Sequence, residues 1–384
     1  MVATTAKEKE QLFRDLWNGK RPERIPIAQA VDIAVGIDKK GLNLVTDQFS
    51  AEKCVEAMDY ITGLIDSDIF PITTPSCYAA DKLLGSRKMV MSSGGFMQHQ
   101  NICVMEDDEY PELAKDPFKY IVDKVLPRLY TNLTGVKEHD EFMFWKAQKI
   151  SDAFFAVYMK GRGETMRKYE RTRFDFNLGL GVAPFDDIAD YLRSFSKIAT
   201  DIRRQPEEVL AAVDAFTAYE LKKMSLYPRG REGGRVFFAL HMATFMREKD
   251  FAKFWWPSYI QILRYLKETD RGIYMFCEDD WSRFMPYLTE CPDDSLMWFE
   301  KTDKKLIVDS LGKKKILTGM FPIENYTLAS KEEAIDKTKE FIDLVGPTER
   351  YQFKANKSPL RGVDIDLDIL DAIFKTVKEY GEYK

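Results

Sequence analysis

The densest group of chemically versatile side chains in the sequence follows a predicted strand at 273–277. Cys277, Glu278, Asp279 and Asp280 place one thiol and three carboxylates at the end of that strand. Such groups are costly to pack together unless a cation joins them or some of them face solvent. A thiolate, a carboxylate and an imidazole are ligands that suit Zn²⁺. A lone cysteine at a strand end is more often a small buried apolar residue, and the two aspartates can instead cap the next helix.

Two of the three histidines are candidates for the same site. His241 directly follows an apolar strand-like run at 236–240, and an imidazole there can be a metal ligand or a hydrogen-bonded pocket residue. His99 lies in a segment whose pattern fits either interpretation. His139 lies in a charged helical stretch that is typical of a solvated surface. We therefore take His241 as a candidate metal ligand and His99 as a candidate substrate contact.

From Arg173 onward, short apolar strands alternate with amphipathic helices. Six strand–helix units follow one another there, and further strands are predicted at 25–30 and 64–72. Such alternation is typical of parallel strands joined by crossover helices. The expected fold is an α/β (β/α)8 TIM-type barrel with an N-terminal helical extension and a helical insertion at 136–170, with an open doubly wound sheet as the alternative. We expect a single domain over residues 1–384.

In a barrel of this type the site lies where the strands end. Aromatic residues make up 13% of the chain, which suits a pocket for a flat apolar ligand as well as an ordinary core. The expected substrate contacts are residues near the strand ends together with the candidate histidine: Trp281, Phe276, His99 and Met320. Asp68 lies in the predicted strand region at 64–72 and is a candidate catalytic residue.

The overall composition argues against several classes of function. The chain has 384 residues with 57 Lys and Arg against 62 Asp and Glu, so its formal net charge is −5. This balance argues against nucleic acid as the main partner, because phosphate binding needs concentrated positive charge. No apolar run approaches the roughly 18 residues of a membrane span, and no secretion signal is visible. Five cysteines without a paired spacing indicate reduced thiols, so we expect a cytoplasmic protein.

Several short motifs together resemble the uroporphyrinogen decarboxylase superfamily over essentially the whole chain. The opening residues 16–19 and 21–26 are similar to the N-terminal signature of the family. A further series resembles the branch of corrinoid-dependent methyltransferases, the methyltransferase components of anaerobic O-demethylase systems: Glu109–Leu113, Asp116–Pro117, Leu126–Arg128, Pro184–Arg193, Phe251–Pro257 and Phe276–Trp281. The resemblance implies a barrel fold and methyl transfer to the cobalt of a corrinoid carried by a partner protein.

The sequence departs from the decarboxylases of this superfamily in the N-terminal region. Porphyrinogen decarboxylases carry an arginine- and glycine-rich motif that binds substrate carboxylates, whereas residues 28–35 of this chain contain no arginine. Asp68 matches the characteristic acidic position of the family. Without the arginines it has no tetracarboxylate to act on, so decarboxylation of uroporphyrinogen is disfavoured.

The sequence also departs from the zinc-dependent coenzyme M methyltransferases of the superfamily, which use a His-x-Cys pair and a distant Cys. Cys277 stands where the first Cys is expected, but Met275 replaces the His and the segment 318–322 contains no Cys. A zinc ion in this chain therefore needs replacement ligands, for which His241 and Glu278 are the candidates.

The resulting hypothesis is a methyltransferase that moves a methyl group from an O-methyl donor, such as a methoxylated aromatic, to a corrinoid protein. The departing oxygen needs a Lewis acid or a general acid. Zinc held by His241, Cys277 and Glu278 would supply the first, and Glu278 or Asp280 the second. The alternatives are a tetrapyrrole or aromatic-acid decarboxylase that uses Asp68, and a non-catalytic tetrapyrrole- or corrinoid-binding protein. Barrels of this kind often pair, so a homodimer is a further expectation.

Overall fold

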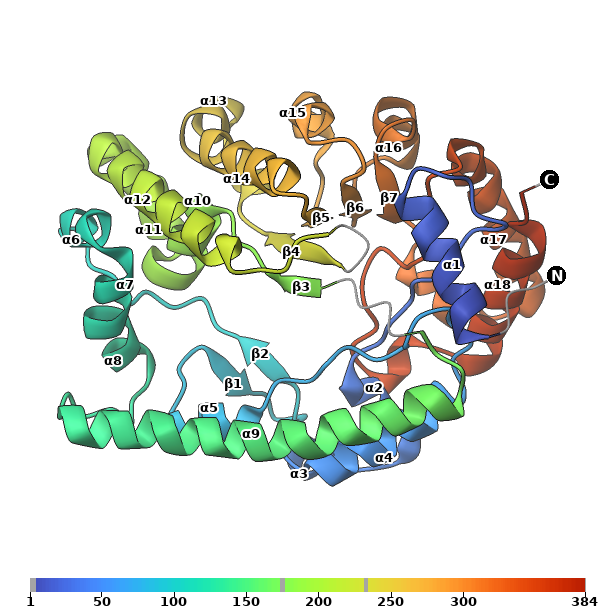
Figure 1. The fold of residues 1–384 in the computed structure, drawn as a ribbon, viewed down its shortest axis with the longest axis horizontal. Coiled ribbons are helices and arrows are strands. Elements are labelled where there is room, and N and C mark those ends of the chain that lie inside the picture. The colour runs from blue at the N-terminus through green and yellow to red at the C-terminus, as the bar shows by residue number, and fades with distance from the viewer. Residues whose placement is uncertain (1–4, 173–176, 231–233, 384) are drawn as a thin grey trace.

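The central element of the computed structural model is a parallel sheet of five strands (Figure 1). The structure describes residues 5–172, 177–230 and 234–383. The strands follow one another in chain order across the sheet: β3 (Asn177–Leu180), β4 (Arg235–Leu240), β5 (Gly272–Cys277), β6 (Leu296–Phe299) and β7 (Ile316–Gly319). The predicted strands at 236–241, 273–277, 296–299 and 316–320 are thereby confirmed, and residues 174–176 of another predicted strand lie outside the described residues.

Helices connect each strand to the next and cover one face of the sheet, as crossover helices do in βαβ units (Figure 1). Polar and apolar residues alternate along them at helical spacing, so that each buries one face. In chain order they are α10 (Pro184–Asp187), η2 (Ile188–Arg193), α11 (Phe195–Arg204), α12 (Pro206–Ser225), η4 (Ala243–Phe245), α13 (Glu248–Asp250), η5 (Phe251–Trp255), α14 (Trp256–Glu268), η6 (Ser282–Phe284), α15 (Met285–Glu290), α16 (Lys304–Leu311), η7 (Ile323–Thr327), α17 (Lys331–Val345), η8 (Gly346–Thr348), η9 (Gly362–Asp364) and α18 (Leu367–Tyr380).

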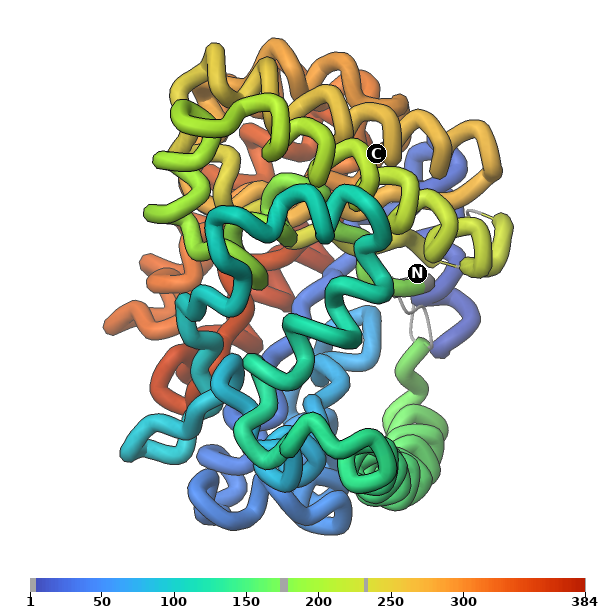
Figure 2. Tube along the Cα trace, turned by 90° about the vertical axis from the view of Figure 1, so that its left-hand side faces the viewer, coloured from blue at the N-terminus to red at the C-terminus, as the bar shows by residue number. Residues whose placement is uncertain are grey.

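The N-terminal part of the chain is mostly helical, with one short antiparallel hairpin, β1 (Met89–Met91) and β2 (Met97–His99). Its longest helix, α9 (Lys137–Lys168), packs against α4 and α5 and lies apart from the helices around the sheet (Figure 2). This confirms the helical segment predicted at 136–170. The other helices are α1 (Ala6–Trp17), α2 (Ile33–Lys40), α3 (Leu44–Asp47), α4 (Ala51–Thr62), α5 (Tyr78–Leu84), α6 (Tyr110–Lys115), α7 (Pro117–Tyr120), η1 (Ile121–Val125) and α8 (Leu126–Leu129).

Isolated parallel bridges extend the strand pairing beyond the five strands. Beyond β7, Leu317 pairs with Tyr351, and Phe353 pairs in turn with Ile27. Two further bridges continue the same order, Val31 with Ile72 and Ile69 with Thr172. The segments around residues 25–31, 69–72 and 351–355 therefore run parallel to the sheet strands, although they form bridges where the sequence predicts strands.

Side chains of the sheet alternate between two apolar clusters. Met275 and Cys277 of β5 belong to the larger cluster, which includes the buried faces of α12 and α14. Tyr274 of β5 belongs to the smaller cluster on the opposite face, against which Phe276 packs. Phe13, Leu16 and Trp17 of α1 close this smaller cluster at the beginning of the strands, so α1 covers the face that the crossover helices leave open.

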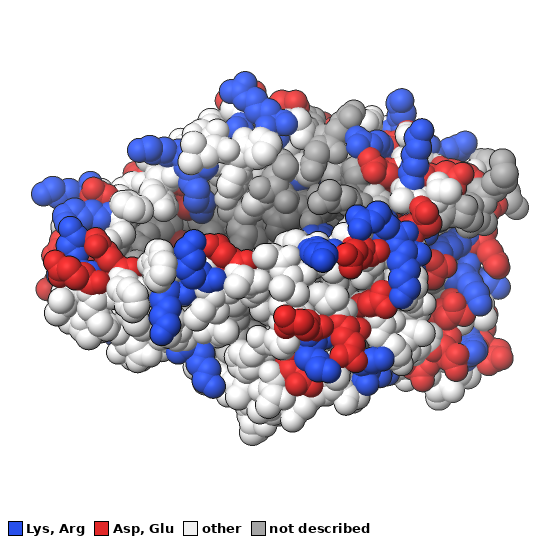
Figure 3. Space-filling model, turned by 60° about the horizontal axis from the view of Figure 1, so that its bottom comes forward, with Lys and Arg blue, Asp and Glu red and all other residues white. Residues whose placement is uncertain are grey.

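The surface carries charges of both signs. Basic and acidic side chains are interspersed over the face that Figure 3 shows, in keeping with the nearly balanced composition. Within the described ranges, no helix combines the length and the apolar character that crossing a membrane requires.

Candidate active site

A histidine and a glutamate meet at the ends of two adjacent strands. Leu240 and Cys277 are the last register partners of β4 and β5. His241 and Glu278 are the residues that directly follow these two strands. The Nδ1 atom of His241 is hydrogen-bonded to Oε2 of Glu278, and both side chains are one-third exposed. Parallel strands in register bring these two side chains together, as the sequence predicts for residues at strand ends.

Three neighbouring carboxylates favour the protonated form of His241. Burial would lower the pKa of His241, but the hydrogen bond and charge of Glu278, with the charges of Asp186 and Asp190, raise it above its ordinary value. Asp186 is buried and accepts hydrogen bonds from the backbone N–H of His241 and the indole N–H of Trp255. Burial raises the pKa of Asp186 to about 6. The protonated imidazole of His241 is therefore favoured. The hydrogen bond from its backbone N–H to Asp186 holds the residue in place.

A second wall comes from the hairpin β1–β2 and from η2. The ring of His99 lies edge-on to Tyr191, with ring centroids 5.4 Å apart, and Nζ of Lys88 lies 3.1 Å from the centroid of the Tyr191 ring. His99 is largely exposed, but partial burial lowers its pKa, and the charges of Lys88 and His241 act in the same direction. The predicted residues His99 and His241 therefore lie within electrostatic reach of each other.

Cys277 does not join this group of side chains. It is fully buried in the larger apolar cluster, and burial raises the pKa of its thiol well above the ordinary value, with a further contribution from Cys291. Successive residues of a strand point to opposite faces, so Cys277 faces the helices while Glu278 turns toward His241. The described part of the chain holds no group of three or more His, Cys, Asp or Glu side chains placed to bind a metal. The donor positions thus do not fit the predicted zinc ion.

Three other predicted residues have their side chains in a helix cap or in the core. Asp280 is exposed and accepts a hydrogen bond from the backbone N–H of Ser282, as the capping alternative expects. Trp281 is fully buried, and its indole donates to the carbonyl oxygen of Glu278. Met320 is 2% exposed within the larger cluster and has a φ of 64°. The side chains of Trp281 and Met320, two of the predicted substrate contacts, therefore lie in the core.

Phe276 has the orientation that the prediction requires. Its side chain is partly buried beside the smaller cluster, and its ring stacks on Trp298 with centroids 3.9 Å apart. Phe276 precedes Glu278 by two residues on the same strand, so both side chains point to the same face of the sheet.

Asp68 lies in a buried ion pair. Its two carboxylate oxygens each accept a hydrogen bond of 2.7 Å from the Arg24 guanidinium, and Oδ2 also accepts from the backbone N–H of Ile27. Both side chains are almost completely buried. This bidentate geometry is typical of a structural pair, and it engages both carboxylate oxygens of the predicted catalytic residue.

The fold of this chain matches a solved structure. A methyltransferase from Methanosarcina mazei superposes with a TM-score of 0.60 over 98% of this chain and 99% of that chain, at 12% sequence identity. No family model matches the chain, and a search of curated proteins finds no match either. At this identity the likeness shows the fold.

Several residues of the site carried no clear signal in the sequence. Asp186 and Asp190 lie in the Pro184–Arg193 motif, but their roles depend on contacts with β4 that the sequence does not reveal. Glu300 accepts a hydrogen bond of 2.7 Å from the backbone N–H of Asp279 and pairs with Lys357 at 2.7 Å. Glu300 differs from the two aspartates because the sequence places it at the end of a predicted strand, and its position opposite Glu278 follows from the register of β5 and β6.

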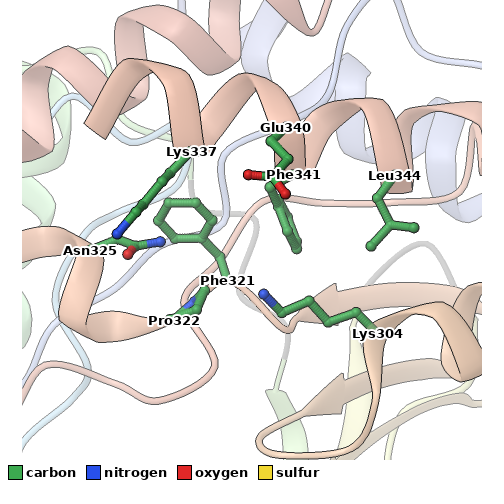
Figure 4. Close-up of a pocket in the computed structure, with 8 residues that line it drawn as sticks. All are labelled: Lys304, Phe321, Pro322, Asn325, Lys337, Glu340, Phe341 and Leu344. Atoms are coloured by element: carbon green, nitrogen blue, oxygen red, sulfur yellow. The ribbon is translucent and has the colours of Figure 1, made fainter. Parts of the chain in front are cut away.

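A separate pocket of about 510 Å³ lies between α16, α17 and the segment after β7 (Figure 4). Its lining includes Lys304, Phe341 and Lys337, but none of the predicted site residues. Figure 4 shows Lys304 and Lys337 entering the pocket from different elements. The candidate active site is therefore the His241–Glu278 pair, and this pocket is separate from it.

Proposed function

We propose that this chain is a methyltransferase that moves a methyl group from an O-methyl donor, a methoxylated aromatic compound, to the cobalt of a corrinoid held by a partner protein. The observation that carries the proposal is the hydrogen-bonded His241–Glu278 pair at the ends of β4 and β5. The structural similarity to a solved methyltransferase supports the proposal independently.

The proposal includes a closed (β/α)8 barrel. The bridges order the segments 69–72, 27–31 and 351–355 beside β7, and the bridge from Ile69 to Thr172 leads back toward β3. Eight parallel segments in this order favour a barrel over an open sheet. The His241–Glu278 pair then lies at the carboxyl end of the barrel, the usual place of catalytic groups in this architecture.

In the proposed reaction His241 is the general acid. The bond between the methyl carbon and the ether oxygen breaks, the methyl group passes to the acceptor, and a proton from His241 neutralises the departing oxygen. Glu278 holds the imidazole by Nδ1, which leaves Nε2 as the nitrogen that faces the leaving group. Positioned proton donors of this kind contribute about 10²–10⁴-fold to a rate. The corrinoid supplies the nucleophile, and no step requires a metal ion held by this chain.

No specific observation favours the decarboxylase alternative. Its candidate catalytic residue, Asp68, is engaged by Arg24 and by the backbone of Ile27. We therefore do not retain it as a second proposal.

The test is methyl transfer by the purified chain. A reduced corrinoid protein and a panel of methoxylated aromatics are supplied, and formation of methyl-cobalt is followed by absorbance. We expect turnover by the native chain and a loss of about 10²-fold or more in His241→Ala. Absence of methyl-cobalt across the panel, with a corrinoid protein that another methyltransferase can methylate, would overturn the proposal.

A further inference from the structure

A lysine without a carboxylate partner is buried in the smaller apolar cluster. Lys354 is 9% exposed and follows Phe353, which bridges to Ile27. Its Nζ atom lies 3.3 Å from the hydroxyl oxygen of Tyr274 and 3.3 Å from the centroid of the Trp298 ring. Among the residues that the structure describes, no Asp or Glu contributes to its electrostatic environment.

This arrangement is costly for the folded protein. An ammonium group taken out of water without a counter-charge loses its hydration, and a cation–π contact with the face of Trp298 compensates only part of that loss. Burial accordingly lowers the pKa of Lys354 to about 7. Tyr274 is the one titratable side chain in contact with Lys354 within the described ranges, and burial raises its pKa, so the phenol stays protonated near neutral pH.

The Nζ atom of Lys354 lies on the same face of the sheet as the His241–Glu278 pair, nearer the beginning of the strands. Its contacts are Tyr274 of β5 and Trp298 of β6, and Phe276 is the register partner of Trp298. Glu278 comes two residues after Phe276, which corresponds to roughly 7 Å along a strand. Nζ of Lys354 and the ring of Phe276 both contact the ring of Trp298, so the two stacked rings lie beside the lysine, at the level that precedes Glu278 by two residues. A single substituted benzene ring has the length to span this interval.

We infer that Lys354 is a ligand-binding residue whose ammonium group pairs with the carboxylate of a flat aromatic ligand lying along Phe276 and Trp298. A carboxylate fits better than other anions, because a phenol is mostly neutral near pH 7 and a phosphate carries more charge than one lysine neutralises. The orientation of the ligand, with its ether oxygen toward His241, rests on the proposed function. The pairing of Lys354 with the carboxylate does not.

The first test measures binding without any corrinoid, by calorimetry at pH 6.5. The probes are 4-methoxybenzoate and its neutral analogue 4-methoxybenzamide. We expect Lys354→Met to weaken binding of the benzoate at least tenfold and to leave binding of the benzamide within twofold of the native value. Retained binding of the benzamide shows that the variant is folded. The matched control is Lys304→Met, in the pocket of Figure 4, which leaves both affinities unchanged.

The second test follows the proton. At pH 8 the amine of Lys354 is mostly neutral, so binding of the carboxylate draws in a proton, and the heat of binding depends on the ionisation enthalpy of the buffer. We expect this buffer dependence in the native chain and not in Lys354→Met.

Two results overturn the inference: no binding of the benzoate by the native chain, or an equal effect of Lys354→Met on the two probes. Failure of methyl transfer with intact, Lys354-dependent binding of the benzoate overturns the proposed function alone.

Discussion

His241 and Glu278 form their hydrogen bond one residue beyond the last register pair of β4 and β5. The pairing of two buried strands therefore sets the position of both side chains, and no loop has to fold around a ligand to assemble them. Groups held on rigid elements lose little freedom when a substrate binds, which is the condition for efficient proton transfer.

The first prediction concerns the charge of Glu278. Glu278→Gln removes the carboxylate that raises the pKa of His241, so this pKa falls. A general acid acts in its protonated form, and methyl transfer therefore declines as the pH rises through the pKa of His241. In the variant this decline moves to lower pH, so we expect a greater loss of activity at pH 8 than at pH 6. The pH profile of methyl transfer measures the shift.

Titration of the histidine ring signals by NMR checks the same prediction without turnover. The chain has three histidines, which makes assignment by single substitutions direct. His139→Gln is the control, because this residue lies in α9 beside Asp140, away from the pair. An unchanged pKa of His241 in Glu278→Gln would contradict the electrostatic account.

The sequence predicted elements better than side-chain directions. The apolar pattern predicts helices at 51–62 and 331–345 and a strand at 296–299, and α4, α17 and β6 have these bounds, because their apolar spacing is regular and their ends carry caps or turn residues. The direction of Cys277 could not be predicted, because β5 is apolar on both faces and its sequence does not show which residues face the helices. A one-residue change of phase moves Cys277 to the site and Glu278 to the core.

For charged residues, the sequence did not predict burial or ion-pair partners. A lysine at the end of a predicted strand, such as Lys354, is typical of a solvated loop, and only the tertiary structure shows that it is buried against Trp298. Asp68 was assigned a catalytic role from its type and place, whereas its partner, Arg24, lies 44 residues away in the chain. Long-range pairing of this kind leaves no periodic signal in a single sequence.

The second prediction concerns the Arg24–Asp68 pair. Asp68→Ala leaves the guanidinium of Arg24 buried without its counter-charge, and breaking a buried pair in this way costs about 3–5 kcal/mol of unfolding free energy. The double variant Arg24→Met, Asp68→Leu recovers much of this loss, because no lone charge remains buried. Urea unfolding measures both. Equal stability of Asp68→Ala and the native chain would show that the pair is not structural.

The third prediction separates packing from metal binding at Cys277. The thiol is fully buried in an apolar layer, so Cys277→Ser places a hydroxyl there at a cost of about 1–3 kcal/mol. Cys277→Ala loses only a small volume, and we expect it to leave the metal content and the rate of methyl transfer at native values. Elemental analysis with urea unfolding checks both variants. Loss of bound zinc in the alanine variant would restore Cys277 to the site.

The fourth prediction contrasts two aromatic residues of the same segment. Trp281 is packed against Phe251 and Phe284, and its indole donates to the carbonyl oxygen of Glu278. Trp281→Phe removes this hydrogen bond and lowers the free energy of unfolding by about 1–2 kcal/mol, with little effect on the affinity for 4-methoxybenzamide.

Phe276 gives the opposite pattern, because its ring faces the smaller cluster and stacks on Trp298. Phe276→Leu keeps most of the apolar volume but loses the flat surface, and we expect affinity for the benzamide to fall about two- to twelvefold, corresponding to the roughly 0.5–1.5 kcal/mol of an aromatic pair. Calorimetry and urea unfolding on both variants separate binding from stability. A weaker affinity in Trp281→Phe than in Phe276→Leu would place the ligand on the helix side of β5 rather than beside His241.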